Sequence, residues 1–272
     1  MPSHGNWCAM WGRADDGSVM TLQACAALVE RGDPDRFAAT LAAPYDLRAK
    51  LWPIYAFNLE IARAPWVSTQ PLIAEMRLQF WRDVLVAEKP PAHEVAGPLH
   101  AILGQTPGLA KLLDRMVDAR RRDIAREPFA SPAEFDGYIE DTSATLLWAA
   151  ALALGADSVA ETAFRALGWA AGLASYLRAV PALTNRNVTP LYDASPTALR
   201  VLAAEGLNHL AIARRQRATF GRAFPAALAG WQAGPLLRQA YDNPTRVAEG
   251  TLALSEFTRR GALVWMGLTG RF

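Results

Sequence analysis

Asn58 and Glu60 interrupt the otherwise apolar segment 51–66, and Tyr55 adds a third hydrogen-bonding side chain to it. A polar group buried among apolar neighbours needs a hydrogen-bond partner, which either the protein or a ligand supplies. We therefore take Tyr55, Asn58 and Glu60 as candidate polar residues of a ligand-binding cavity.

The next segment of the chain carries three further candidates, Arg77, Gln79 and Arg82. Arginines that share a cleft could hold a diphosphate group bidentately. An ion pair between helices, from Glu60 or Glu75 to one of these arginines, explains the same residues equally well. The residue types leave an anion site and a structural ion pair open.

Asp114 and Asp118 form a carboxylate pair with D-x-x-x-D spacing. Carboxylates four residues apart share one face of a helix and could gather a metal ion. Arginines surround this pair, and Asp118 stands four residues before Arg122. We favour a solvated, ion-paired helix face with an Asp118–Arg122 pair over a metal site.

The histidines and cysteines follow no metal-ligand spacing, and two thiols cannot form a disulfide framework. We expect no metal ligands among them, and a reducing, cytoplasmic compartment. The residues concerned are His4, His93, His100, His209, Cys8 and Cys25.

The composition of the 272 residues is that of an ordinary globular protein, with 51% hydrophobic residues, 20% charged residues and a formal net charge of +2. No run of Lys and Arg is long enough to indicate nucleic-acid binding. No apolar run is long enough to cross a membrane. We expect residues 1–19 to be a disordered leader or a misassigned start, and residues 20–272 to form one domain.

Helical periodicity dominates from Thr21 onwards, and no alternating strand pattern is evident. The sequence therefore predicts an all-α fold with a loop over 185–195. Helices are expected over 21–30, 36–42, 45–64, 71–88, 93–103, 107–126, 131–154, 157–180, 196–220, 225–241 and 244–272.

Two of these helices, 145–154 and 167–177, are apolar on nearly every face, which is typical of the centre of a bundle. Their many Ala and Gly residues allow either close helix packing or a cavity, and we favour close packing. The segment 257–268 is basic and then apolar. A membrane surface could account for it, but we favour packing against the core.

Four segments in order resemble the squalene/phytoene synthases: Tyr55-Ala56-Phe57, 76–81, 138–154, and the Leu177-Arg178-x-Val180 step. The resemblance extends from Leu22 to the C-terminus. It implies a single isoprenoid-synthase-like helical bundle around a central apolar cavity that holds prenyl chains. Arg178 joins the candidate cavity residues on this ground.

Active members of that family carry two D-x-x-x-D motifs whose aspartates gather Mg²⁺ around the leaving diphosphate. The resemblance assigns these four aspartate positions to Ala62, Trp66, Ala179 and Leu183. All four carboxylates are absent, so we expect no metal site and no catalytic residues at these positions. Asp123 corresponds to an acidic position near the cavity mouth in the family.

The variant pattern over 57–62 and 76–81 is similar to a divergent branch that includes assembly factor 6 of respiratory complex I. The resemblance implies a non-catalytic or atypical isoprenoid-binding protein, or a complex I assembly factor without a cofactor. Its partners would be a prenyl lipid or prenyl diphosphate, complex I subunits, and the inner face of the membrane as a peripheral contact. The alternatives are an active, Mg²⁺-dependent prenyl transferase that makes phytoene or squalene, and a structural scaffold with a filled core.

Overall fold

The structure, a computed structural model, describes residues 16–271, and its regular secondary structure in that range is entirely helical. The prediction for residues 1–15 lies outside the described residues, and the first helix begins at Asp16, inside the predicted leader. The helices are α1 (Asp16–Gly32), α2 (Pro34–Leu41), α3 (Tyr45–Arg63), α4 (Pro71–Val86), α5 (Ala96–Leu103), α6 (Leu109–Ala125), α7 (Pro132–Ile139), α8 (Thr145–Ala153), α9 (Glu161–Thr184), α10 (Pro196–Arg215), α11 (Phe224–Ala227), α12 (Ala233–Asp242), α13 (Thr245–Glu249) and α14 (Glu256–Thr269).

Short-range signals set the starts of α2 and α7, as predicted. The Asp33 carboxylate accepts a hydrogen bond from the backbone N–H of Arg36 at 2.9 Å, and the Ser131 hydroxyl accepts one from Glu134 at 3.2 Å. A proline follows each cap at the first helical position. These starts are confirmed because three or four consecutive residues are enough to encode them.

The helix predicted over 131–154 is interrupted by a π-helical segment, Glu140–Ala144, which joins α7 to α8. Inside it, the Thr142 hydroxyl donates to the carbonyl of Tyr138 at 2.7 Å. The Thr145 hydroxyl at the start of α8 donates to the carbonyl of Glu140 at 3.0 Å. Such a segment adds a residue to the turn and changes the faces that the two flanking helices present.

The single helices predicted over 225–241 and 244–272 are wrong, because each is broken. Between α11 and α12, Gly230 lies so close to Leu167 that a Cβ atom would meet its side chain at 2.7 Å. Gly250 ends α13 with a φ of 69°, a conformation that other residues rarely adopt. Close packing and a left-handed turn therefore divide the C-terminal region into short helices.

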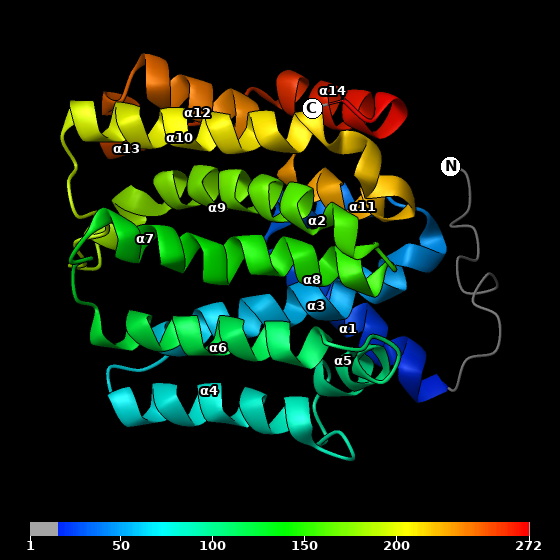
Figure 1. Ribbon diagram of the computed structural model, residues 1–272. Coiled ribbons are helices and arrows are strands. Elements are labelled where there is room, and N and C mark those ends of the chain that lie inside the picture. The colour runs from blue at the N-terminus through cyan, green and yellow to red at the C-terminus, as the bar shows by residue number, and fades with distance from the viewer. Residues whose placement is uncertain (1–15, 272) are drawn as a thin grey trace, which may run out of the picture.

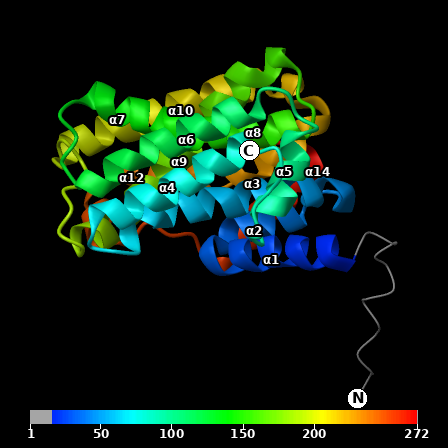
Figure 2. The same ribbon diagram turned by 90° about the horizontal axis from the view of Figure 1, so that it is seen from below.

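The helices run side by side, and α9 lies in the middle of the bundle between α8 and α10 (Figure 1). Helix α4 forms one edge, where it packs on α6, and α12 and α14 lie at the opposite edge. In the perpendicular view, α1 and α2 lie on the side opposite α7 and α10 (Figure 2). The largest fully buried side chains include Tyr55 and Phe57 of α3 and Phe164 and Trp169 of α9.

Close packing is the role of the glycines in the N-terminal half of α9. A Cβ atom on Gly168 would lie 2.8 Å from the Cα atom of Ala144, and one on Gly172 would lie within 3.0 Å of the Ser143 side chain. The backbones of α9 and the π segment therefore touch here. This is the close packing that we favoured for the small residues of 167–177.

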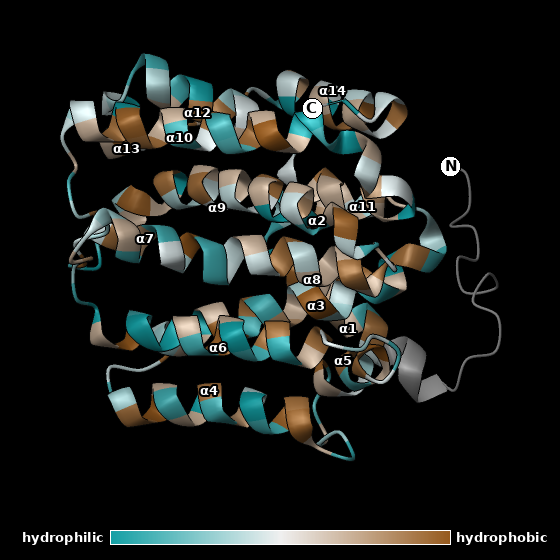
Figure 3. Ribbon diagram, in the orientation of Figure 1, coloured by the Kyte–Doolittle hydropathy of each residue, from teal (hydrophilic) through white to brown (hydrophobic). Residues whose placement is uncertain are grey.

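The helices at both edges of the bundle, α4 and α14, contain hydrophobic residues (Figure 3), and several of these residues are exposed. In α14, only Met266 is buried, while Phe257 is 89% exposed and Leu268 is 82% exposed. The expectation that 257–268 packs mainly into the core is wrong. Among the described helices, none is both long and apolar enough to cross a membrane.

Candidate functional site

Three of the four aspartate positions, Trp66, Ala179 and Leu183, line one small pocket of about 160 Å³, here named the motif pocket. Ala62 lies one helical turn before Trp66 on α3 and is half-buried. The α3 end and the α9 end therefore face each other, as the resemblance requires. The other polar residues that line the motif pocket are Arg120, Arg122, Asp123, Arg126, Glu127, Tyr138, Tyr176 and Thr189.

A closed hydrogen-bond network forms one wall of the motif pocket. The Arg120 guanidinium donates to the Tyr138 hydroxyl at 2.6 Å and pairs with the Asp123 carboxylate at 3.2 Å. The Tyr138 hydroxyl donates to the same carboxylate at 3.0 Å. Burial raises the pKa of Tyr138, so this hydroxyl keeps its proton and remains a donor. Asp123 is thus committed to two protein partners.

Two cations lie against Trp66, one of the four aspartate positions, and one of them, Arg126, lines the motif pocket. The guanidinium groups of Arg126 and Arg186 lie over the Trp66 ring, 5.4 Å and 5.3 Å from its centroid. Within the described part of the chain, neither guanidinium has a carboxylate within 4.0 Å. Arg122 lies 3.6 Å over the Phe129 ring and pairs with Glu134 at 2.8 Å. The pocket therefore suits an anion better than a cation.

A Mg²⁺ cluster does not fit the residues that are present. Magnesium prefers carboxylate oxygens, and the positions that would supply them hold Ala, Trp, Ala and Leu. Asp123 is already bonded to Arg120 and Tyr138. Across residues 16–271, no three His, Cys, Asp or Glu side chains are grouped so that they could hold a metal ion.

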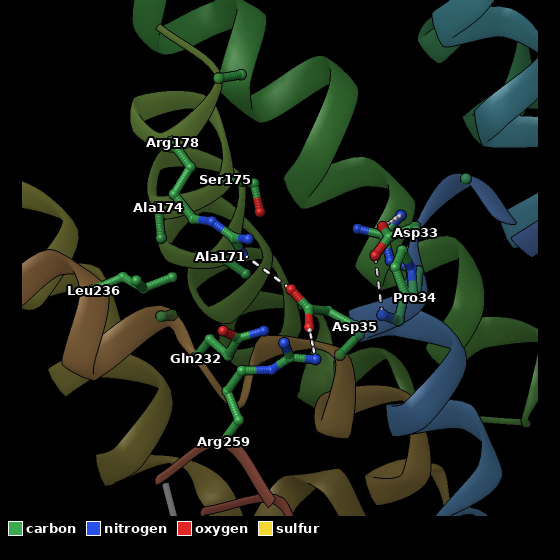
Figure 4. Close-up of a pocket in the computed structure, with 15 residues that line it drawn as sticks. Asp33, Pro34, Asp35, Ala171, Ala174, Ser175, Arg178, Gln232, Leu236 and Arg259 are labelled. Atoms are coloured by element: carbon green, nitrogen blue, oxygen red, sulfur yellow. Dashed lines mark hydrogen bonds and ion pairs between the residues drawn. The ribbon is translucent and has the colours of Figure 1, made fainter. Parts of the chain in front are cut away.

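A second, larger cavity of about 430 Å³ opens beside α9 and is named here the Asp35 cavity (Figure 4). Its charged and polar lining residues are Asp33, Asp35, Arg36, Ser175, Arg178, Gln232 and Arg259. Alanines and Leu236 line much of the rest. The Asp35 cavity therefore has charged as well as apolar side chains in its lining.

Asp35 joins two helices that are distant in sequence. Its carboxylate pairs with Arg178 of α9 at 3.0 Å and with Arg259 of α14 at 2.9 Å (Figure 4). Burial of the carboxylate opposes ionisation, but hydrogen bonds from Arg178 and Gln232 and the charge of Arg259 outweigh it and lower the pKa of Asp35. Arg178 was expected at the cavity, and the structure places it there.

Between α3, the π segment and α9, only about 40 Å³ remains, lined by Tyr55, Ser143 and Gly172 among others. This volume is close to that of a single water molecule. Tyr55 is 1% exposed, and the Arg36 guanidinium lies 5.2 Å from its ring centroid. Tyr55 therefore reaches the centre of the bundle, but the space beside it is too small for a prenyl chain.

The polar candidates of α3 and α4 do not converge on these cavities. Asn58 is buried, and among the described residues its Oδ1 atom accepts no hydrogen bond. Glu60 and Arg77 line a separate open groove of about 400 Å³. Gln79 is exposed and donates to Asp83 on the same helix at 2.8 Å. Helix α4 is an edge helix, and its polar face turns to solvent.

Arg82 forms ion pairs with the predicted carboxylate pair, Asp114 and Asp118. Arg82 bonds Asp114 at 2.6 Å and 3.0 Å, and Asp118 lies 3.9 Å away. The ion-paired face is therefore present, but the predicted Asp118–Arg122 pair is wrong, since Arg122 pairs with Glu134. These carboxylates join α6 to α4 through their ion pairs with Arg82, and they line neither the motif pocket nor the Asp35 cavity.

The motif pocket and the Asp35 cavity depend on residues that sequence reasoning missed. Arg120, Arg126 and Arg186 read as surface charges, and Asp35 and Arg259 lie more than two hundred residues apart. The one available signal was the cluster of arginines around Asp123, at a position that the resemblance placed near the cavity mouth.

Comparison with known proteins matches residues 29–229 to squalene/phytoene synthase. The complex I assembly factor 6 homolog of Drosophila melanogaster is 32% identical over 200 residues, which is 70% of this chain and 58% of that protein. Assembly factor 6 of Homo sapiens is 27% identical over 169 residues, or 61% of this chain and 51% of that protein. The chain thus spans about half the length of these relatives.

Two solved structures share the architecture. A dehydrosqualene synthase crystallised with a ligand superposes with a TM-score of 0.68 at 11% identity, over 91% of this chain and 95% of that one. The squalene synthase HpnC of Alicyclobacillus acidocaldarius gives a TM-score of 0.57 at 16% identity, over 94% and 97% of the two chains. At these identities the likeness shows the fold alone, and it confirms the all-α isoprenoid-synthase class.

Proposed function

The chain belongs to the squalene/phytoene synthase family, and we propose that it keeps the fold of that family without its metal-dependent condensation. In this proposal it acts as an assembly factor for the respiratory NADH:quinone oxidoreductase, complex I. It does so in the cytoplasm, at the inner face of the membrane that holds the complex.

The motif pocket carries this proposal. Ionising an allylic diphosphate requires metal ions, or an equivalent positive cluster, held against the leaving group. Trp66, Ala179 and Leu183 line the pocket and offer no oxygen ligand, and Asp123 is bonded to two protein groups. The narrow gap of about 40 Å³ beside Tyr55 also leaves no room for a prenyl chain between α3 and α9.

The relatives support the assembly role. The Drosophila melanogaster protein is an assembly factor 6 homolog and the Homo sapiens protein is assembly factor 6 of complex I, and they match 70% and 61% of this chain. A contact with a particular subunit or assembly intermediate of complex I is part of the proposal.

Deletion of the encoding gene in its own host, with complementation by the wild-type gene, tests the assembly role. We expect native gels of the membranes to lose fully assembled complex I, and NADH:quinone oxidoreductase activity to fall with it. Complementation with Gly168→Leu, which should be strongly destabilised, should restore less complex I than the wild-type gene. Normal complex I in the deletion strain would refute the assembly role.

Turnover of farnesyl or geranylgeranyl diphosphate tests the absence of the condensation. We expect purified protein with Mg²⁺ to release no inorganic diphosphate, while the Alicyclobacillus squalene synthase serves as the positive control. The variant with Ala62→Asp, Trp66→Asp, Ala179→Asp and Leu183→Asp should gain Mg²⁺ binding in titration calorimetry. Formation of squalene, dehydrosqualene or phytoene by the wild-type protein would overturn the proposal.

A second candidate function, binding of a prenyl diphosphate without turnover, rests on Arg126 and Arg186. Both guanidiniums lie over the Trp66 ring without a carboxylate within 4.0 Å among the described residues, and Arg126 lines the motif pocket. Inorganic diphosphate should bind in the presence of EDTA, and Arg126→Gln should weaken binding roughly ten-fold, as expected for one charge-assisted contact. Arg121→Gln, on the side of α6 that pairs with Glu75 of α4 and outside the motif pocket, is the control.

A further inference from the structure

Helix α14 turns its apolar side to solvent, which reverses the usual orientation of a surface helix. Phe257, Val264, Trp265 and Leu268 are 89%, 59%, 58% and 82% exposed. Their spacing places them on one face, because residues at i, i+7, i+8 and i+11 of a helix lie along one stripe. We call these four residues the α14 stripe.

The opposite face of α14 is fixed to the protein. Met266 is buried, and Ala262 and Leu263 pack partly against the core. Arg259 reaches back into the Asp35 cavity and pairs with Asp35 at 2.9 Å. The stripe is therefore held outward by contacts on the inner face. A rotation of α14 that buried Phe257 and Leu268 would break the ion pair with Asp35.

The charges beside the stripe are mainly positive. Residues 256–271 contain three arginines and one glutamate. The Arg260 side chain is 84% exposed, pairs with the exposed Glu256 at 3.5 Å and stands one helical turn before Val264, and exposed Arg271 follows Leu268 by three residues. Exposed arginines flanking an apolar stripe match the negative headgroups of a lipid surface.

The shape of this region also favours a lipid surface over a groove in another protein. Helix α14 lies at the outer edge of the bundle (Figure 1), and none of the four residues of the stripe lines a cavity described above. At about 1.5 Å per residue, α14 is about 21 Å long, too short to cross a bilayer but suitable for lying in its interface. Tryptophan and phenylalanine are favoured at that depth.

We propose that α14 is an interfacial helix that docks the protein on an anionic membrane through Phe257, Val264, Trp265 and Leu268, with Arg260 and Arg271 on the headgroups. Docking leaves the motif pocket and the Asp35 cavity intact, because only the outer face of α14 takes part. This role does not depend on the assembly function, so either one can fail without the other.

Co-sedimentation of the full chain with vesicles tests the docking role. Vesicles of phosphatidylcholine with roughly 30% phosphatidylglycerol should bind the wild type, and pure phosphatidylcholine should bind it less. The double variant Phe257→Ser, Leu268→Ser should lower partitioning at least ~10-fold. Arg260→Gln with Arg271→Gln should remove the preference for anionic vesicles and the sensitivity to salt.

The matched control lies on the opposite edge of the bundle. Leu72 and Val86 of α4 are 70% and 82% exposed, so Leu72→Ser with Val86→Ser removes similar exposed apolar area. This variant should bind vesicles like the wild type, and circular dichroism should show that both double variants are folded. Unchanged vesicle binding by the stripe variant would overturn the proposal. So would a dimer that the stripe variant dissociates, since the occupant of the stripe would then be a second copy of the chain.

Discussion

The two halves of α9 serve opposite purposes. In the N-terminal half, residues 161–172, Gly168 and Gly172 bring the backbone onto the π segment, and Phe164 and Trp169 are fully buried. In the C-terminal half, residues 173–184, Ala179 lines both the motif pocket and the Asp35 cavity.

This contrast shows that helix packing and the ligands of the family's metal site depend on different parts of α9. Helix packing depends on volume, so the N-terminal half keeps small residues wherever a Cβ atom would collide. The C-terminal half presents Ala179 and Leu183, which offer no oxygen ligands, to a pocket that arginines also line. A bundle can lose the ligands of a metal site and keep its core, because the two depend on different turns of one helix.

Gly168→Leu should give the largest effect on stability, because it attacks the packed half of α9. A Cβ atom at this position already meets Ala144 and Leu147 under 3.0 Å, so the larger side chain forces α8 and α9 apart. We expect the free energy of unfolding to fall by about 3 kcal/mol, measured by urea denaturation. Ala179→Leu, which points into open space in the other half, should change it by less than about 1 kcal/mol. Equal effects would contradict the contrast.

Arg120→Met should be the most damaging change in the motif pocket. It leaves the Asp123 carboxylate, whose side chain is 12% exposed, without its cation. Breaking a buried pair costs more than the pair contributes, so we expect a loss of about 2–3 kcal/mol in thermal or urea unfolding. Arg121→Met, whose partners Glu75 and Asp118 are more exposed, should cost less than about 0.5 kcal/mol. A neutral Arg120→Met would show that the network is not formed in solution.

Asp35→Asn should reveal an acid-dependent link between the open half of α9 and α14. The pKa of Asp35 is lowered in the folded protein from its ordinary 3.8, so its contribution is complete above pH 3.8 and is lost as the pH falls through the lower, folded value. At pH 7 the variant should be about 1 kcal/mol less stable than the wild type. At pH values below the lowered, folded pKa of Asp35 the two unfolding curves should converge. A difference that does not vary with pH would exclude this ionisation as the cause.

Arg186→Gln should give the smallest effect, since it removes one exposed guanidinium from the Trp66 ring. A contact of this kind contributes about 0.5 kcal/mol at an exposed site. A double-mutant cycle with Trp66→Leu isolates the pair, and urea unfolding of the four proteins should give a coupling of that size. A coupling of zero would mean that Arg186 does not rest on Trp66 in solution.

Much of the fold could be predicted because the signals are local. Asp33 and Ser131 mark helix starts within four residues, and the apolar runs on α8 and α9 mark the centre of the bundle. The π segment was not predictable, since its two threonine hydroxyl bonds form only inside a helix that is already in place. The sequence around Gly230 does not indicate a helix break, because the break depends on the contact between Gly230 and Leu167 in the folded protein.

The sequence predicted which carboxylates are missing from the site, but not which residues surround those positions in the folded protein. Alignment by motif located Trp66, Ala179 and Leu183, and the structure brings these three together. Arg126 and Arg186 come from different segments, and only the tertiary fold brings both to the Trp66 ring. For the same reason, the edge position of α4 could not be inferred from its sequence, and its polar residues were placed too close to the cavity.

Because of the π segment, the direction in which α7 faces depends on the number of residues between α7 and α8. A π turn takes up one residue more than an α turn, so deleting one residue from 140–144 would make α7 and α8 one regular helix with α7 facing nearly as before, whereas deleting two would turn α7 by about 100°. Two hydrogen bonds of α7 would then break. Asp136 would no longer accept the 2.8 Å hydrogen bond from Trp169, and the Tyr138 hydroxyl would no longer donate to Asp123. The number of residues between Pro132 and Ala153, more than the identity of any of them, sets the direction in which α7 faces.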